Sequence, residues 1–334
     1  MLKLHPSLSI IIACTRPQTV LQCLDGLSKQ EGQIIFEVII VGNCPAIIDT
    51  YQRFSLRLID CQAKHANIRR NKGIENSKAP LIAFLDDDTI PDPHWVAQAL
   101  QLNPNDKLII TGPERPTRDH WKSRLAFAVS QNKITEGLPG HVNQKSAFVS
   151  WTEVPFCNCV IPKAIFDQIG YPATDIPWDM DDFEFCNRAR RVAQFVNVPK
   201  LSVCHDRYPD SITKFILYKA KLRIRTGEKL ISHPNIYWKI PAVVLSALCP
   251  YLLIMTLIII PLMIDSPFYI SVISLAGLYL IIILSQIPIA ISKIGFRMCL
   301  LYLAMIAIIH FVTVASVHAG IISRLFSKIR LLHD

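Results

Sequence analysis

The stretch LIAFLDDD, residues 81–88, decides the fold, because five apolar residues run without a gap into three aspartates. A short apolar run of this kind is typical of a strand that is buried on both faces of a sheet. Two further apolar runs lie upstream, at residues 8–14 and 36–41, and a shorter one at residues 56–59. Together they predict an α/β domain built on a mostly parallel sheet.

Helical patterns separate these predicted strands. Apolar residues at helical spacing occupy residues 19–27, and a second crossover is predicted at residues 66–76. Open parallel sheets bind their ligands outside the carboxyl ends of the strands. The candidate functional residues are therefore those that follow Cys14, Val41 and Leu85.

The three aspartates are candidates for a metal site. Asp86, Asp87 and Asp88 leave the end of a buried strand together. Carboxylates so placed, with a diphosphate supplying further oxygens, suit Mg²⁺ or Mn²⁺. A solvated acidic turn, or the cap of a following helix, would have the same sequence, and this alternative stays open.

A second acidic cluster, DMDDFE at residues 179–184, opens a predicted helix that carries Arg188 near its end. Acidic residues at the start and basic residues at the end of a helix match its dipole. A partly desolvated carboxylate near a metal can accept a proton from an attacking hydroxyl, and Asp182 is the candidate. Ordinary helix capping is the alternative.

The C-terminal third is far more apolar than the rest. Residues 241–264, 268–292 and 298–323 contain no Asp, Glu, Lys or Arg. Each run exceeds the roughly 20 residues that span a hydrocarbon core. We expect a membrane domain at residues 241–323 with about three transmembrane helices, followed by a basic tail at residues 324–334.

The net charge of +9 is concentrated before this apolar region, since residues 200–239 hold nine Lys or Arg against three Asp or Glu. The sequence predicts a basic amphipathic interfacial helix within residues 211–240 that meets membrane lipids. A solvated helix packed on the preceding domain is the alternative. No aromatic-interleaved basic stripe is present, so we expect no nucleic acid partner.

The N-terminal apolar run is too short and too weakly basic at its start for a secretory signal. Ten scattered cysteines without metal-site spacing indicate reduced thiols. We therefore expect residues 1–210 to form a cytosolic domain anchored to a membrane, with the bacterial plasma membrane as the expected location.

Four motifs carry a resemblance to a known family: LSIIIACTRP at residues 8–17, NIRRNKGI at 67–74, FLDDDTIP at 84–91 and DDFEF at 181–185. In this order they resemble the family-2 glycosyltransferases of the GT-A fold, over about residues 7–230. The resemblance implies a Rossmann-like catalytic domain, here followed by C-terminal transmembrane helices. It also implies an inverting transfer of a sugar from a nucleotide-sugar donor.

The resemblance implies residue roles as well. Asp86 would contact the ribose or sugar, Asp88 would bind the metal that bridges the diphosphate, and Asp182 would be the general base. His205 would be a metal or phosphate contact, although a core or surface histidine is the alternative. The remaining predicted donor-binding residues are Thr15, Arg16, Asn43, Arg70 and Asp87.

The sequence departs from the family at Gly42 and Asn43, which stand in place of an acidic pair that commonly faces the nucleobase. Asn43, or Asp60 after the next strand, is the substitute. Uridine is the donor base favoured at this stage. The sugar is not readable from the sequence.

The acceptor is expected to be membrane-associated because of the apolar C-terminal region: a polyprenyl-phosphate, a lipid-linked oligosaccharide, a glycolipid or a surface polysaccharide. A non-catalytic GT-A domain that binds nucleotide-sugars as a sensor or assembly partner is the main rival. A transporter subunit is disfavoured, because the apolar runs hold no acidic residue. A homo-oligomer is left open.

Overall fold

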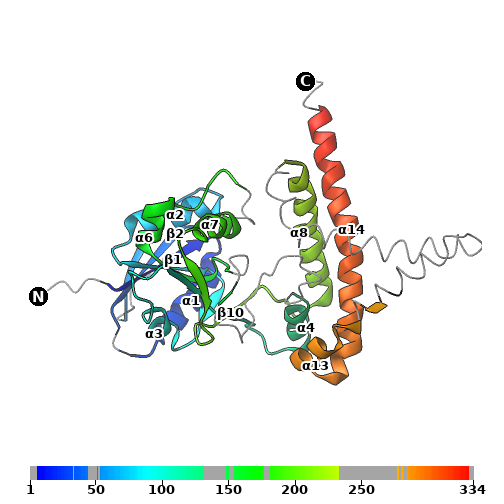
Figure 1. The fold of residues 1–334 in the computed structure, drawn as a ribbon, viewed down its shortest axis with the longest axis horizontal. Coiled ribbons are helices and arrows are strands. Elements are labelled where there is room, and N and C mark those ends of the chain that lie inside the picture. Colours follow the sequence, from blue (N-terminus) through cyan, green and yellow to red (C-terminus); the bar gives the residue numbers. More distant parts are fainter. Residues whose placement is uncertain are drawn as a thin grey trace, which may run out of the picture. The chain divides into compact units, whose positions relative to one another are not determined.

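The computed structural model describes residues 6–32, 34–43, 51, 53–130, 148–149, 154–176, 181–232, 277, 280–281 and 284–330. The chain divides into two compact units (Figure 1). The first unit comprises Met1–Thr117 and Gly140–Arg207, and the second comprises Arg118–Pro139 and Tyr208–Asp334.

A seven-stranded sheet with the order β3-β2-β1-β4-β8-β6-β9 forms the centre of the first unit. Strands β1 to β4 run parallel, and the antiparallel β8 connects them to the parallel pair β6 and β9. This confirms the predicted mostly parallel sheet and its strand positions. The bounds are β1 (Leu8–Cys14), β2 (Phe36–Gly42), β3 (Ser55–Asp60), β4 (Leu81–Asp86), β6 (Leu108–Thr111), β8 (Asn158–Pro162) and β9 (Gln194–Asn197).

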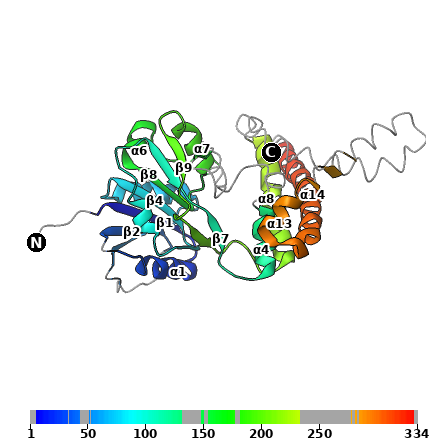
Figure 2. The ribbon, with the colours of Figure 1, turned by 60° about the horizontal axis from the view of Figure 1, so that its bottom comes forward.

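Helices cover both faces of this sheet (Figure 2). α1 (Pro17–Ser28) and α3 (Trp95–Ala99) share one hydrophobic cluster with Ile10 and Ile12 of β1. Ile11 points to the opposite face, as alternation along a strand requires. On that face lie α2 (Ala66–Asn76), α6 (Lys163–Ile169) and α7 (Asp181–Ala189).

The strand order reverses its direction beside β1. From β1 the chain moves outward to β2 and β3, and then returns to place β4 on the other side of β1. Such a reversal is the topological switch point where open α/β sheets bind ligands. The carboxyl ends of β1 and β4 meet there, so the three aspartates that follow Leu85 lie at this switch point.

A second, three-stranded sheet stands beside this edge. It consists of β5 (Thr89–Pro91), β10 (Val203–His205) and β7 (Glu114–Pro116), with β10 in the middle. In its register His205 lies opposite Thr89 on one side and Pro116 on the other. The small sheet thus brings β7 and β10, which are distant in the sequence, to the segment that follows Asp88.

The described part of the second unit is helical. It contains α4 (Trp121–Ser130), α8 (Ile212–Ser232), α13 (Ile287–Ile294), the short 3₁₀ helix η3 (Phe296–Met298) and α14 (Cys299–Arg330). α8 packs along α14 at two glycines. A Cβ on Gly227 would lie 2.0 Å from the Val317 carbonyl oxygen, and one on Gly320 would lie 1.9 Å from that of Ile224. Small residues of this kind let two helix backbones approach closely.

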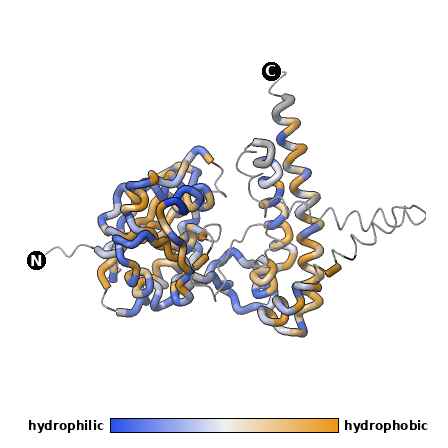
Figure 3. The backbone as a smooth tube through the Cα atoms, viewed as in Figure 1, coloured by the Kyte–Doolittle hydropathy of each residue, from blue (hydrophilic) through white to orange (hydrophobic). Residues whose placement is uncertain are grey.

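Within the described ranges, one helix is long and apolar enough to cross a membrane, the 32-residue Phe296–Ser327. It contains the third predicted span, residues 298–323, and Figure 3 shows its apolar character along most of its length. The predicted span 241–264 lies outside the described residues, as does most of 268–292. At the end of the latter the chain turns at residues 285–286 before α13 begins, so three spans stay a prediction.

α8 occupies most of the predicted interfacial region, and residues 233–240 of that region lie outside the described residues. Its cations do not share one exposed face. Lys219 and Arg223 are buried, whereas Lys214 and Lys221 are exposed. Lys219 places its ammonium group 5.3 Å from the centre of the Phe215 ring. Lys214 and Lys221 are therefore the exposed cations among the described side chains of this helix.

Candidate metal and donor site

The three aspartates have different surroundings. β4 ends at Asp86, a turn carries Asp87 and Asp88, and β5 begins at Thr89. Asp87 and Asp88 are buried, whereas about a third of the Asp86 side chain is exposed. The Thr89 hydroxyl closes the turn by donating to the Asp86 carbonyl oxygen over 2.8 Å. The three carboxylates therefore point to different partners.

Asp87 fastens the end of β4 to the turn between β1 and α1. Its Oδ2 accepts hydrogen bonds from the backbone N–H groups of Thr15 and Arg16, over 2.6 and 2.8 Å, and from the Thr15 hydroxyl. Its Oδ1 accepts from the Arg16 guanidinium. With both oxygens in use, Asp87 connects two strand ends.

Asp88 meets His205 across the small sheet. His205 Nε2 lies 3.1 Å from Asp88 Oδ1, and the Asp206 backbone N–H donates to the Asp88 carbonyl oxygen over 3.0 Å. The Arg16 guanidinium lies 2.9 Å from the same Oδ1. Asp88 thus joins the small sheet to the central one.

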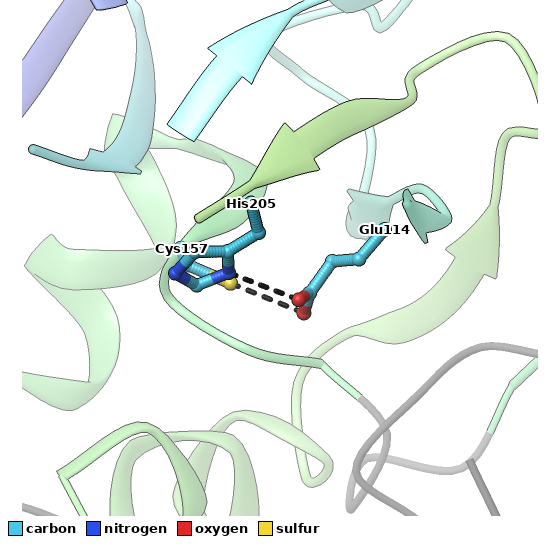
Figure 4. A group of neighbouring side chains, drawn as sticks. All are labelled: Glu114, Cys157 and His205. Atoms are coloured by element: carbon cyan, nitrogen blue, oxygen red, sulfur yellow. Dashed lines mark hydrogen bonds and ion pairs between the residues drawn. The ribbon is translucent and has the colours of Figure 1, made fainter. Parts of the chain in front are cut away.

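The other nitrogen of His205 faces a buried network (Figure 4). Nδ1 lies 3.0 Å from Glu114 Oε2, which also pairs with Arg207 over 2.8 Å. The Cys157 thiol donates to Glu114 Oε1 over 3.3 Å. Both oxygens of Glu114 therefore have partners. Because both ring nitrogens face a carboxylate, Nδ1–H donates to Glu114 and Nε2–H donates to Asp88 in the metal-free protein.

These contacts shift two pKa values in opposite directions. Burial alone would lower the pKa of His205, but the hydrogen bonds to Asp88 and Glu114 outweigh it and raise the pKa to about 9. Burial alone would raise the pKa of Asp88, but His205 and Arg16 lower it to about 2. At neutral pH the pair is an imidazolium beside a carboxylate.

Asp86 and Arg70 form the third element of the site. Arg70 Nη2 lies 3.3 Å from Asp86 Oδ1, while its Nη1 donates to Asn67 Oδ1 over 3.1 Å. Desolvation of the carboxyl group raises the pKa of Asp86, although part of the side chain stays exposed, and Arg70 opposes this rise. Arg70 therefore neutralises Asp86 from the side of α2.

Asp86, Asp88 and His205 could hold a metal ion together. One ligand atom from each lies within 4.8 Å of the others. Two carboxylate oxygens and an imidazole nitrogen suit Mg²⁺ or Mn²⁺, with phosphate or water oxygens filling the remaining positions. The donor set fits such an ion, and Asp87 is outside it. The roles assigned to the three residues stay predictions.

A second group of possible ligands, Glu114, Cys157 and His205, lies on the other side of the imidazole. Arg207 already contacts the Glu114 oxygen that a cation would use there. Burial raises the pKa of the Cys157 thiol well above its usual value, which disfavours the thiolate that a metal needs. We interpret this group as a network that supports His205.

The remaining predicted residues are Asn43 and Asp182. Asn43 follows β2, is exposed, and donates its backbone N–H to the Cys14 carbonyl oxygen over 3.2 Å. Asp182 is half-buried at the start of α7. Burial raises the pKa of the Cys159 thiol, Arg70 opposes this rise, and Asp182 and Asp86 add to it.

Sequence reasoning missed Glu114, Cys157, Arg207 and Arg69. Glu114 is one acidic residue in a proline-rich segment, and its contact with His205 joins residues 91 positions apart. No sequence motif relates two residues that are so far apart in the chain. The position of His205 after a short predicted strand was its only local signal.

Comparison with known proteins agrees with this fold. Residues 9–170 match the family model described as glycosyl transferase family 2. No curated protein matches the chain.

Among solved structures, the mannosyltransferase PcManGT from Pyrobaculum calidifontis, in complex with GDP-Man and Mn²⁺, is similar at 12% identity and a TM-score of 0.54. The alignment covers 98% of this chain and 89% of that one. Residues 1–349 of S. aureus TarS align at 14% identity and a TM-score of 0.45, over 94% and 92% of the two chains. The similarity to the mannosyltransferase shows a shared GT-A fold.

Proposed function

We propose that this chain is a metal-dependent, inverting glycosyltransferase of family 2, which moves a sugar from a nucleotide-sugar donor to a membrane-associated acceptor. The observation that carries the proposal is the group formed by Asp86, Asp88 and His205 at the switch point of the sheet. The family match over residues 9–170, which includes the β4 motif, supports it.

Asp88 and His205 would hold the ion, with Asp86 completing the protein ligands or contacting the donor ribose or sugar. A divalent ion at this site would neutralise the charge that develops on the nucleoside diphosphate leaving group. Arg16 lies beside Asp88 and can contact a phosphate oxygen from the β1–α1 turn. In the PcManGT complex the ion is Mn²⁺, and Mn²⁺ or Mg²⁺ would serve here.

Asp182 would accept the proton of the acceptor hydroxyl. It opens α7, where the helix dipole stabilises its carboxylate, and its Oδ1 accepts the Phe183 backbone N–H over 2.7 Å. A single in-line displacement with this base on the acceptor side would invert the anomeric carbon. Arg188 follows one helical turn after Glu184 and pairs with it at 2.5 Å, which stabilises α7, the helix that carries Asp182.

The acceptor is proposed to be lipid-linked because α14 is long and apolar and exposes large apolar side chains. Leu300, Phe311 and Phe326 are between 56% and 81% exposed, which is costly in water and favourable in lipid. A cytosolic catalytic unit on a membrane anchor, in a bacterial plasma membrane, is the arrangement we propose. The acceptor classes named from the sequence all fit it.

Transfer by the purified full chain in native lipids tests the proposal. Release of nucleoside diphosphate from a panel of nucleotide-sugars should require Mn²⁺ or Mg²⁺ and should stop with EDTA. Asp182→Asn should lower kcat about 10²- to 10⁴-fold with little change in donor affinity. Asp167→Asn, an exposed aspartate on α6, is the control and should not change the rate.

Two outcomes would count against the proposal. An undiminished rate in Asp182→Asn would remove the base assignment. Donor binding without any transfer, across lipid-linked and glycan acceptors, would favour the non-catalytic nucleotide-sugar-binding alternative.

A further inference from the structure

Arg69 is a buried arginine with two nitrogens that have no hydrogen-bond partner among the residues that the structure describes. It lies in the first turns of α2 and is 7% exposed, and the two nitrogens are Nε and Nη1. The neighbouring Arg70, also buried, is bonded to Asn67 and Asp86. Burying an unsatisfied guanidinium is unfavourable, so such a group in a native structure needs an explanation. A ligand that supplies acceptor atoms is one.

The position of Arg69 connects it to the ligand-binding edge of the sheet. Its Cδ lies 3.2 Å from the place where a Cβ on Gly42 would stand. Gly42 is the last residue of β2 and pairs with Cys14, the last residue of β1. At this point φ is +137°, and a Cβ would lie 2.1 Å from the Cys14 carbonyl oxygen. Only glycine fits, and the Arg69 side chain occupies the space beside it.

This position lies two strands away from Asp86 in the central sheet. Asp86 ends β4, and β4, β1 and β2 are consecutive neighbours in the sheet. With strands about 4.8 Å apart, the ends of β4 and β2 are separated by roughly 10 Å. A donor whose diphosphate lies at Asp86 and Asp88 can therefore extend its ribose and base over β1 toward Gly42 and Arg69.

The chemistry of Arg69 limits which base it can bind. A guanidinium has five N–H donors and no acceptor. Guanine presents two neighbouring acceptors, N7 and O6, which arginine contacts with two hydrogen bonds. Uracil places an N–H donor between its two carbonyl groups, which calls for a carboxylate, whereas β2 ends here at Gly42 and is followed by Asn43.

We propose that Arg69 is a specificity-determining residue of the donor site and that it selects guanine nucleotides over uridine nucleotides. The inference rests on the proposed function and replaces the uridine expected from the sequence. It assigns a recognition role to a side chain outside the predicted site residues.

Equilibrium binding of GDP and UDP to the full chain, with saturating Mn²⁺, tests the inference. The wild-type protein should bind GDP at least about 10-fold more tightly than UDP, since two well-placed hydrogen bonds discriminate on this scale. Arg69→Met should remove this preference by weakening GDP. Arg57→Met is the matched control, because Arg57 is paired with Glu37 and with the Asn76 carbonyl oxygen and lies away from Gly42.

Thermal unfolding of the nucleotide-free variants gives an independent readout. Replacing an unsatisfied buried cation by an apolar side chain of similar length should raise Tm by about 2 °C or more. Arg57→Met removes a paired arginine and should not raise it. An Arg69→Met variant that unfolds at a lower temperature would show that Arg69 has a structural partner, and the inference would fail.

The binding outcomes separate this inference from the proposed function. Tighter binding of UDP than GDP, or a preference for GDP that survives in Arg69→Met, would overturn the inference. Equal weakening of GDP and UDP would place Arg69 on the ribose or phosphate and would also overturn it. If the wild-type protein binds neither nucleotide, the proposed function itself fails.

Discussion

Replacing Asp87 by alanine should destabilise the protein without removing a metal ligand. Asp87 is 2% exposed, and its two oxygens accept five hydrogen bonds from Thr15 and Arg16. Asp87→Ala leaves two backbone N–H groups without an acceptor, each worth about 1–3 kcal/mol when buried. Thr15 and Arg16 are themselves exposed, so water can replace part of this bonding.

The lower end of that range applies, and we expect a loss of about 2–3 kcal/mol. For a domain of this size that is a fall in Tm of about 4–12 °C. Thermal unfolding of the metal-free full chain measures it, and hydrogen exchange at the Thr15 and Arg16 amides should accelerate. Asp25→Ala is the control, because Asp25 is an exposed aspartate of α1 paired only with Lys29 among the described contacts.

The same variant separates Asp87 from Asp88 in function. Mn²⁺ affinity should fall much more in Asp88→Ala than in Asp87→Ala, because only Asp88 belongs to the possible ligand group. A Tm of Asp87→Ala within about 1 °C of the wild-type value would refute the conclusion that Asp87 stabilises the protein by connecting the two strand ends. An equal loss of Mn²⁺ affinity in both variants would refute the division of roles.

Three further predictions follow from the buried network and from the helix pair. Glu114→Gln should weaken Mn²⁺ binding about 10- to 100-fold, because the Glu114 carboxylate no longer orients the His205 ring. Cys157→Ser should change Mn²⁺ affinity little, and Mn²⁺ titration of the two variants distinguishes these outcomes. The pKa of His205 is raised to about 9, so its contribution to the free energy of unfolding of the metal-free protein is complete below about pH 6.5 and is lost as the pH rises through 9. Over that range the wild-type protein should lose at most about 3 kcal/mol of unfolding free energy, and His205→Gln should lose much less. Equal pH dependence of the unfolding free energy in the two proteins would contradict this. Gly320→Ala should lower the Tm of the full chain in detergent, because its Cβ would lie 1.9 Å from the Ile224 carbonyl oxygen, whereas Gly277→Ala, with no described atom within 4 Å of its Cβ, should not.

The central sheet could be predicted because its strands are continuous apolar runs that end in polar residues. Leu8–Cys14 and residues 81–85 read as buried strands, and both are central in the sheet. The crossover helix Ala66–Asn76 was also confirmed to the residue. Asp86 and Asp88 lie at the end of β4 as the sequence indicates, whereas the pairing of β10 with β5 brings His205 to them.

What could not be predicted depends on side-chain direction and on distant pairing. The three consecutive aspartates look equivalent in the sequence, yet Asp87 faces the β1–α1 turn and Asp88 faces His205. Glu114 reaches His205 only because β7 and β10 pair in the small sheet. The basic composition of α8 suggested a helix lying on lipid, but burial of Lys219 and Arg223 depends on its packing within the second unit.

The most direct test of the account is the position of a bound metal. A crystal of the full chain, soaked with Mn²⁺ and GDP and measured at the manganese absorption edge, should show one anomalous peak between the Asp88 carboxylate and His205 Nε2, within about 2.2 Å of each. A peak between Glu114 and Cys157, or no peak near Asp88 while GDP is bound, would contradict the proposed metal-dependent donor site.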